Sequence, residues 1–187
     1  MKEKLRSIFL IPVVNLLIKF NVHPNIITIT NFVLNIVPFY FYVKKLFIFG
    51  AISLVIINLL DAIDGELARK VSKTSKFGAF LDSNLDRFSE SIIFLALIIA
   101  FKEDFIIQML LIICAFGSFF ISYIRARGEG LGILIKVGPM ERAERIAFIF
   151  IMSFFVNYIF YFLIVFSLLI YFTVLRRIFT GFKLLSL

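Results

Sequence analysis

Several residue types are scarce in this chain of 187 residues, which has one cysteine, one histidine and no tryptophan. The single Cys114 excludes a disulfide-stabilised fold, and we expect it to be a small packing residue. His23 has no second histidine with which to form a metal-ligand set, and we expect it to be a polar residue at the membrane interface. Only 17% of the residues are charged, whereas 61% are hydrophobic and the mean hydropathy is +1.04. Because soluble domains average about 45–50% apolar residues, this composition excludes both a soluble and a disordered chain.

The apolar residues form continuous runs such as 51–60 and 92–101, which indicate membrane helices rather than the alternating pattern of a barrel. A helical crossing needs about 20 residues, so the chain has room for six or seven crossings and no soluble domain. We therefore predict one membrane domain, 1–187, with a six-helix bundle over 24–177. Asn157 offers the polar turn that divides the long run 146–175. The predicted spans are 24–43, 46–69, 78–101, 105–127, 140–156 and 158–175.

The first 22 residues superficially resemble a signal peptide, because basic residues precede an apolar stretch. There is no small-residue cleavage site, and Pro12, Asn15 and Lys19 interrupt the stretch. This pattern is typical of an interfacial amphipathic helix, which we predict over 1–22. The predicted fold is thus an all-α integral membrane protein with six transmembrane helices and an N-terminal interfacial helix.

Basic residues are distributed unequally between the two ends of the predicted spans. Of the 20 Lys and Arg residues, only Lys44, Lys45 and Lys102 fall on one side. Because Lys and Arg collect in cytoplasmic loops, both termini are predicted to be cytoplasmic, in the cell membrane. Topology signalling accounts for most of these residues, but the same charge would also attract anionic headgroups and phosphorylated substrates. The one long cytoplasmic connection, 128–139, carries four glycines, and we expect it to be flexible and able to move over a site.

Four of the five aspartates lie within 26 positions, at the predicted cytoplasmic ends of the second and third spans. Asp61 and Asp64 are spaced i, i+3, and Asp82 and Asp86 are spaced i, i+4, so each pair projects from one helical face. Four carboxylates at the membrane edge repel one another and need cations. Oxygen ligands suit hard divalent ions, with Mg²⁺ the default near phosphates. The alternative is a solvated rim paired with the neighbouring basic residues Arg69, Lys73 and Arg87.

These carboxylates form part of a longer motif with small residues at fixed spacing. Gly65 and Ala68 share the face of the first aspartate pair, and Gly78 opens the facing helix. The whole motif resembles the signature of the CDP-alcohol phosphotransferases without a departure, and the likeness extends to His23-Pro24-Asn25 and Thr28. Its specified residues are Asp61, Asp64, Gly65, Ala68, Arg69, Gly78, Asp82 and Asp86.

The resemblance implies an integral membrane enzyme that transfers a substituted phosphoryl group from a CDP-linked donor to an acceptor hydroxyl and releases CMP. By the family pattern, the four aspartates bind two divalent metal ions, Mg²⁺ or alternatively Mn²⁺, and Asp86 is also the general base. The likeness further implies a homodimer. We expect no nucleic-acid partner. The resemblance places six residues at the CDP donor: Gly65, Ala68 and Gly78 make space for the cytidine, and Pro24, Thr28 and Arg69 lie against the nucleotide or phosphates.

Four arginines form a second predicted site at the junction of the fourth and fifth spans. Arg125 and Arg127 end one helix, and Arg142 and Arg145, at i, i+3, begin the next. Converging guanidinium groups suit a phosphate monoester. Alternatively, Glu129, Glu141 and Glu144 pair with these arginines, and the rest mark topology.

The segment 122–127, Ser-Tyr-Ile-Arg-Ala-Arg, followed by Glu-Arg-x-Glu-Arg at 141–145, resembles the phosphatidylinositol-phosphate and archaetidylinositol-phosphate synthase branch. That likeness implies that the four arginines hold the phosphate of inositol 1-phosphate. The donor would be CDP-diacylglycerol or CDP-archaeol. Three alternatives stay open: CDP-inositol as donor, glycerol phosphate as acceptor, and a small membrane transporter. A transporter is disfavoured because the charges cluster at one membrane face rather than near the midplane.

Overall fold

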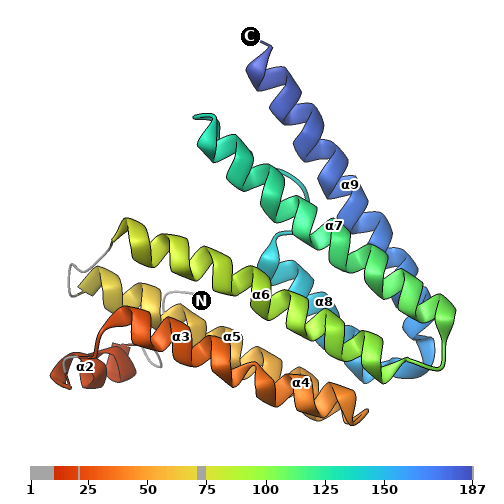
Figure 1. Cartoon of the computed structure of the whole chain (residues 1–187), viewed down its shortest axis with the longest axis horizontal. Helices are drawn as coiled ribbons and strands as arrows, with labels where there is room; N and C mark the ends of the chain where they lie inside the picture. The colour runs from red at the N-terminus through yellow and green to blue at the C-terminus, as the bar shows by residue number, and fades with distance from the viewer. Residues whose placement is uncertain (1–10, 21, 71–74, 187) are drawn as a thin grey trace.

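The computed structural model describes residues 11–20, 22–70 and 75–186, and every regular element in these ranges is a helix. Helices α3 to α6 pack together with α2 at one end, and α7 and α9 run side by side as a pair (Figure 1). Helix α8 contacts both α5 and α9 and so joins the two groups. The elements are α2 (Ile11–Lys19), α3 (Pro24–Leu34), α4 (Ile36–Val43), α5 (Phe47–Lys70), α6 (Lys76–Ala100), α7 (Phe105–Gly130), α8 (Arg142–Phe154), the 3-10 turn η2 (Val156–Tyr158) and α9 (Ile159–Leu185).

All six segments predicted to span the membrane are helical in the structure. The first is divided at Asn35 into α3 and α4, because Pro38 has no N–H to donate to the carbonyl of Leu34. Three segments of the described chain are long and apolar enough to cross a membrane: Pro24–Val43, Phe105–Gly130 and Val156–Leu185. Helix α5 is apolar only over Phe47–Asp61, because charged residues follow. Crossing by all six segments therefore stays a prediction.

Helix α9 continues to Leu185, beyond the end of the predicted span 158–175. Arg176 and Arg177 directly follow this span and belong to the basic residues predicted to be cytoplasmic. In the structure Arg177 is buried, and its guanidinium donates hydrogen bonds to the carbonyls of Ile121 and Val137 at 2.8 and 3.0 Å. These carbonyls solvate the Arg177 charge within the protein, and the helix continues past it.

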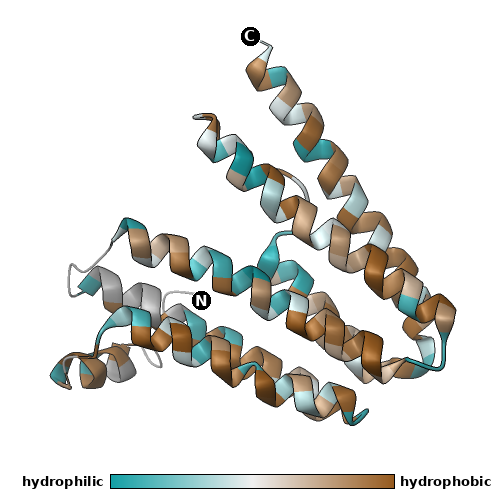
Figure 2. Cartoon of the chain, in the orientation of Figure 1, coloured by the Kyte–Doolittle hydropathy of each residue, from teal (hydrophilic) through white to brown (hydrophobic). Residues whose placement is uncertain are grey.

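The main core lies where α6, α7, α8 and α9 meet. Leu97, Leu111, Ile149 and Leu163 are buried there, and Cys114 is buried among them as a packing residue. Hydrophobic side chains also cover much of the outer surface, while hydrophilic residues gather where α6 passes the start of α8 (Figure 2). An apolar exterior with an internal polar cluster is the arrangement expected of a membrane protein.

A smaller core joins α2 to the rest of the chain. Val14 is buried against Ile63 and Leu67 of α5, and Asn15 accepts a hydrogen bond from the Lys70 ammonium at 3.0 Å. The predicted interfacial helix over 1–22 is thus helical over Ile11–Lys19, and residues 1–10 lie outside the described chain. Its location at the membrane interface stays a prediction.

The glycine-rich connection between α7 and α8 is anchored at several points, although the sequence favours a flexible segment. Its Ile135 is buried, and the N–H of Met140 donates to Thr173 Oγ1 at 3.3 Å. Gly138 has a φ of +100°, and a Cβ at this position would lie 2.4 Å from Thr173 Cγ2. The glycine therefore allows a positive φ and close packing on α9.

We expect Gly138→Ala to lower the free energy of unfolding by more than about 1 kcal/mol, because alanine is strained at positive φ and collides with Thr173. Gly130→Ala is the matched control, since nothing lies within 4 Å of a Cβ placed there. Thermal unfolding of the two variants in detergent measures the difference. Equal stabilities would show that the connection tolerates a side chain and is not tightly packed.

Candidate active site

Three of the four predicted metal-binding aspartates meet between α5 and α6. Asp61 comes from α5, and Asp82 and Asp86 come from successive turns of α6. One oxygen of each carboxylate lies within 4.8 Å of the other two. The fourth, Asp64, lies in α5, but its side chain is outside the described part of the structure.

The chemistry of this group fits a divalent metal ion. Its ligand atoms are all carboxylate oxygens, which hard cations such as Mg²⁺ and Mn²⁺ prefer. Asp61 and Asp86 retain only 23% and 20% of their side-chain exposure, so repulsion between the carboxylates is weakly screened by water. The group therefore needs positive charge within the protein.

Arg142 supplies positive charge at this position in the structure. From the first turn of α8, its Nη1 lies 2.8 Å from Asp61 Oδ2 and its Nη2 lies 2.9 Å from Asp86 Oδ1. The sequence predicts Arg142 as a ligand of the acceptor phosphate, and the structure also places it against the aspartates. Its side chain thus lies between two predicted sites.

A cavity of about 300 Å³ lies beside the carboxylates, between α6, α7, α8 and α9. Three of the four arginines predicted to bind phosphate line it, namely Arg125, Arg142 and Arg145. Arg127 is exposed and does not line this cavity. The structure therefore brings most of the predicted second site together and places it next to the first. The other charged residues that line the cavity are Asp82, Asp86, Arg87, Glu90, Glu129, Glu141 and Arg177.

Arg145 is held by a buried ion pair that crosses from α8 to α6. Its Nε and Nη2 each lie 2.6 Å from an oxygen of Glu90, and its Nη1 donates to the Met140 carbonyl at 3.0 Å. Glu90 also accepts a hydrogen bond from Ser118 of α7 at 2.5 Å. This network orients the Arg145 guanidinium with a two-point contact.

Sequence reasoning missed Glu90 and Arg177 as residues of this site. Glu90 follows Asp86 by four residues, and this i, i+4 spacing is the signal that would have placed it on the same helical face. Arg177 had no such signal, because its partners are two backbone carbonyls and Glu141, at 3.5 Å. Such contacts between distant segments are visible only in the folded chain.

The structure describes only some of the side chains predicted to bind the CDP donor. Pro24 and Thr28 are buried on α3, and Thr28 lines a narrow cleft with Asp61 and Asp86. A Cβ at Gly78 would lie 3.1 Å from Asn25 Oδ1, so the glycine permits α6 to approach α3. Gly65, Ala68 and Arg69 belong to α5, but their side chains lie outside the described residues.

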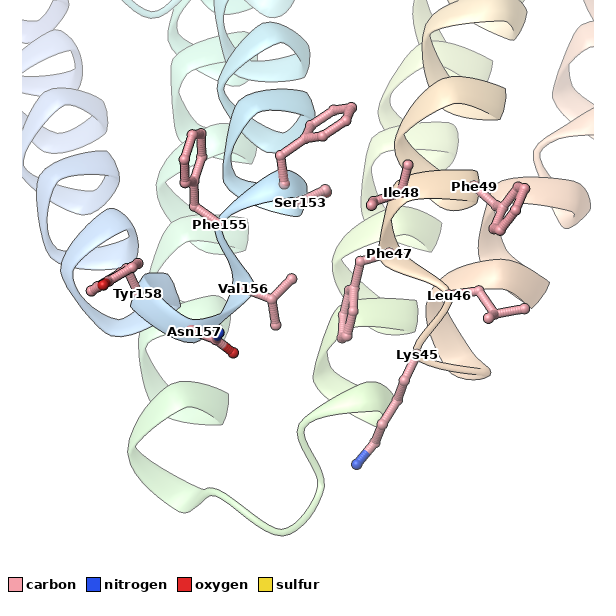
Figure 3. A pocket seen from close by; sticks show the side chains of 11 residues that line it. Lys45, Leu46, Phe47, Ile48, Phe49, Ser153, Phe155, Val156, Asn157 and Tyr158 are labelled. Atoms are coloured by element: carbon pink, nitrogen blue, oxygen red, sulfur yellow. The ribbon is translucent and has the colours of Figure 1, made fainter.

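A larger cavity, of about 420 Å³, lies at the opposite ends of α5 and α8 (Figure 3). Its described lining is mostly apolar and aromatic, with Lys45, Ser153, Asn157 and Tyr158 as the polar members. No carboxylate is among these lining residues, so they offer no metal site of the kind formed by the aspartates.

Comparison with known proteins supports the family resemblance that the aspartate motif indicates. Residues 21–179 match the CDP-alcohol phosphatidyltransferase family. The chain is 40% identical over 134 residues to the archaetidylinositol phosphate synthase of Pyrococcus horikoshii, which covers 71% of this chain and 69% of that protein.

Two crystal structures of the Mycobacterium tuberculosis phosphatidylinositol phosphate synthase share the fold. The structure with CDP-DAG bound has a TM-score of 0.87 at 23% identity and covers 92% of this chain and 93% of that chain. The complex with manganese and citrate has a TM-score of 0.84 at 24% identity and covers 91% and 88%. The aspartate motif, the matching region and the relatives agree, and this chain is a transferase that belongs to the CDP-alcohol phosphatidyltransferase family.

Proposed function

We propose that this enzyme acts in phospholipid biosynthesis, transferring the phosphatidyl-type group of a CDP-linked lipid to inositol 1-phosphate and releasing CMP. The observation that carries the proposal is the shared boundary of the two sites. Asp82 and Asp86 belong to the carboxylate group and also line the arginine-rich cavity. A donor pyrophosphate at the carboxylates and a phosphorylated acceptor in the cavity would therefore meet. The name of the Pyrococcus horikoshii relative supports this acceptor.

The donor half of the site consists of the aspartates and the residues around them. Asp61, Asp64, Asp82 and Asp86 would hold two divalent ions, with Mg²⁺ the expected metal. When bound, such ions neutralise pyrophosphate oxygens and stabilise the departing CMP. Six residues would accommodate the CDP group: Pro24, Thr28, Gly65, Ala68, Arg69 and Gly78.

Asp86 is the proposed general base. Its carboxylate lines both the acceptor cavity and the narrow cleft that contains Thr28, so it lies between the two substrates. It would accept the proton of the acceptor hydroxyl as that oxygen bonds to the lipid-bearing phosphorus. The bond from this phosphorus to the bridging oxygen breaks, and CMP leaves with that oxygen.

The acceptor half of the site would bind the phosphate of inositol 1-phosphate through Arg125, Arg142 and Arg145, and Arg177 lines the same cavity. Guanidinium groups provide paired donors that match phosphate oxygens. Free inositol and serine carry no phosphate for these guanidinium groups to bind. Arg127, which is exposed, remains a proposed contributor.

We propose that six helices cross the cell membrane, with both termini and the active site at the cytoplasmic face, in a homodimer. The distribution of Lys and Arg supports this orientation. It would let a lipid-linked donor enter from one leaflet and a water-soluble acceptor enter from the cytoplasm.

The test is an acceptor panel with purified enzyme, Mg²⁺ and either CDP-diacylglycerol or CDP-archaeol. We expect CMP release with inositol 1-phosphate but not with glycerol 3-phosphate, serine or inositol. CMP release only with glycerol 3-phosphate would contradict inositol 1-phosphate as the acceptor and favour the branch of the family that uses glycerol phosphate. No CMP release with either lipid donor, together with CMP release from CDP-inositol, would contradict the proposal that the donor is a CDP-linked lipid.

A further inference from the structure

Arg142 differs from the other arginines of the cavity in the partners that it has. Its two terminal nitrogens bind Asp61 and Asp86, which belong to the proposed metal-ligand group. Its Nε is buried and has no hydrogen-bond acceptor among the described residues. The side chain keeps 30% of its exposure and lines the acceptor cavity. Arg142 is therefore incompletely bonded where it lies and has open space beside it.

The neighbouring arginines bind partners that lie outside the proposed metal-ligand group. Arg145 donates three hydrogen bonds, to Glu90 and the Met140 carbonyl, and is buried. Arg177 donates to two carbonyls and to Glu141, and is also buried. Arg125 pairs with Glu129 at the surface. Among these four, only Arg142 has partners that a divalent ion would also need.

The charges that line the cavity balance. Five acidic residues face five arginines, so the formal charge of the lining is zero. A phosphate monoester is an anion and gains less from a neutral lining than from one with a net positive charge. A divalent ion at the carboxylates would compete with the Arg142 guanidinium for the same oxygens, because both bind there through their positive charge. It would also leave that guanidinium without an acceptor.

We infer that Arg142 couples the metal site to the acceptor pocket. Its guanidinium binds either Asp61 and Asp86 or the acceptor phosphate, and a divalent ion on the carboxylates shifts it to the phosphate. The inference rests on the proposed function for the location of the two sites, but not on the identity of the acceptor. It makes metal and acceptor binding mutually favourable, so each should raise the affinity for the other by the same factor.

The first test measures Mn²⁺ binding by electron paramagnetic resonance, with the full-length protein in detergent and no substrate. We expect Arg142→Gln to bind Mn²⁺ about tenfold more tightly than wild type, because the competing guanidinium is gone. Arg125→Gln is the matched control, since it removes one positive charge from the same cavity without touching the aspartates. Its Mn²⁺ affinity should rise far less. Arg142→Lys should give an intermediate affinity, because one ammonium replaces the two-point contact, and it serves if Arg142→Gln does not fold.

The second test measures binding of inositol 1-phosphate and, in parallel, glycerol 3-phosphate by calorimetry, with and without Mg²⁺. Wild type should bind at least one of them about tenfold more tightly with Mg²⁺. In Arg125→Gln, the affinity for the acceptor should fall both with and without Mg²⁺, and the ratio of the two affinities should stay the same. In Arg142→Gln, Mg²⁺ should raise the affinity for the acceptor much less than in wild type.

Two results would overturn the coupling: Mn²⁺ affinity in Arg142→Gln that is no higher than in Arg125→Gln, or a Mg²⁺ effect that persists in Arg142→Gln. Failure of both monoesters to bind at all would overturn it too. Neither test involves phosphoryl transfer, so they remain distinct from the acceptor panel. Coupling with glycerol 3-phosphate alone would contradict the proposed acceptor and leave the role of Arg142 intact.

Discussion

Asp82→Asn is expected to lower kcat for CMP release by about a thousandfold, which corresponds to about 4 kcal/mol of lost transition-state stabilisation. Asparagine has nearly the same shape but lacks the negative charge that holds a divalent ion. Asp82 has no ion pair among the described residues, unlike Asp61 and Asp86, which both bind Arg142. The substitution therefore tests metal binding without breaking an ion pair described in the structure.

Two further variants show whether the effect of Asp82→Asn comes from the loss of metal binding. Glu103→Gln is the control, because Glu103 is exposed, lies between α6 and α7, and contacts only Lys102 among its described ionic partners. It should keep wild-type activity. Asp86→Asn should chiefly depress turnover, through the loss of the base. More than a tenth of wild-type activity in Asp82→Asn would contradict the metal assignment, as would activity that survives removal of divalent ions with EDTA.

Arg145→Ala is expected to lower the free energy of unfolding by about 3–5 kcal/mol, the usual effect of removing one partner from a buried ion pair. Glu90 is 6% exposed, and only Ser118 would remain as its described hydrogen-bond donor. Arg125→Ala is the matched control, because its pair with Glu129 is 40% exposed on the arginine side and contributes about 1 kcal/mol or less. Thermal or denaturant unfolding in detergent measures both variants.

A second variant separates the buried charge from the packing around it. Glu90→Gln combined with Arg145→Met removes both charges at similar volume, and we expect it to recover much of the stability lost in Arg145→Ala. It should not recover acceptor binding. In Arg145→Lys, which keeps the charge, the KM for inositol 1-phosphate should rise more than the KM for the donor. No recovery in the double variant would mean that the instability of Arg145→Ala does not come from the unpaired buried charge of Glu90.

The carboxylate group was predictable because it depends on short spacings within the sequence. The spacings of Asp61, Asp82 and Asp86 follow helical periodicity, and the motif that contains them is specific. The apolar runs likewise predicted six helical segments. The cavity at the start of α8 was predicted from the arginines alone, and the structure places three of the four around it.

The partners of those arginines were not predictable, because the contacts join distant segments. Sequence proximity suggested glutamates at 129, 141 and 144 as their partners. The structure confirms Arg125 with Glu129, four residues apart, but pairs Arg145 with Glu90, 55 residues away. The burial of Arg177 was not predictable for the same reason, since carbonyls from other segments solvate it.

The most direct test of the proposed reaction follows the acceptor phosphate. Purified enzyme, Mg²⁺ and a CDP-linked lipid are incubated with inositol 1-phosphate carrying a ³²P label on its phosphate, and the label is partitioned between lipid and water. We predict label in the lipid phase in equal amount to the CMP released, and none when EDTA is present. Label that stays in water while CMP is released would contradict transfer of a phosphatidyl-type group to inositol 1-phosphate.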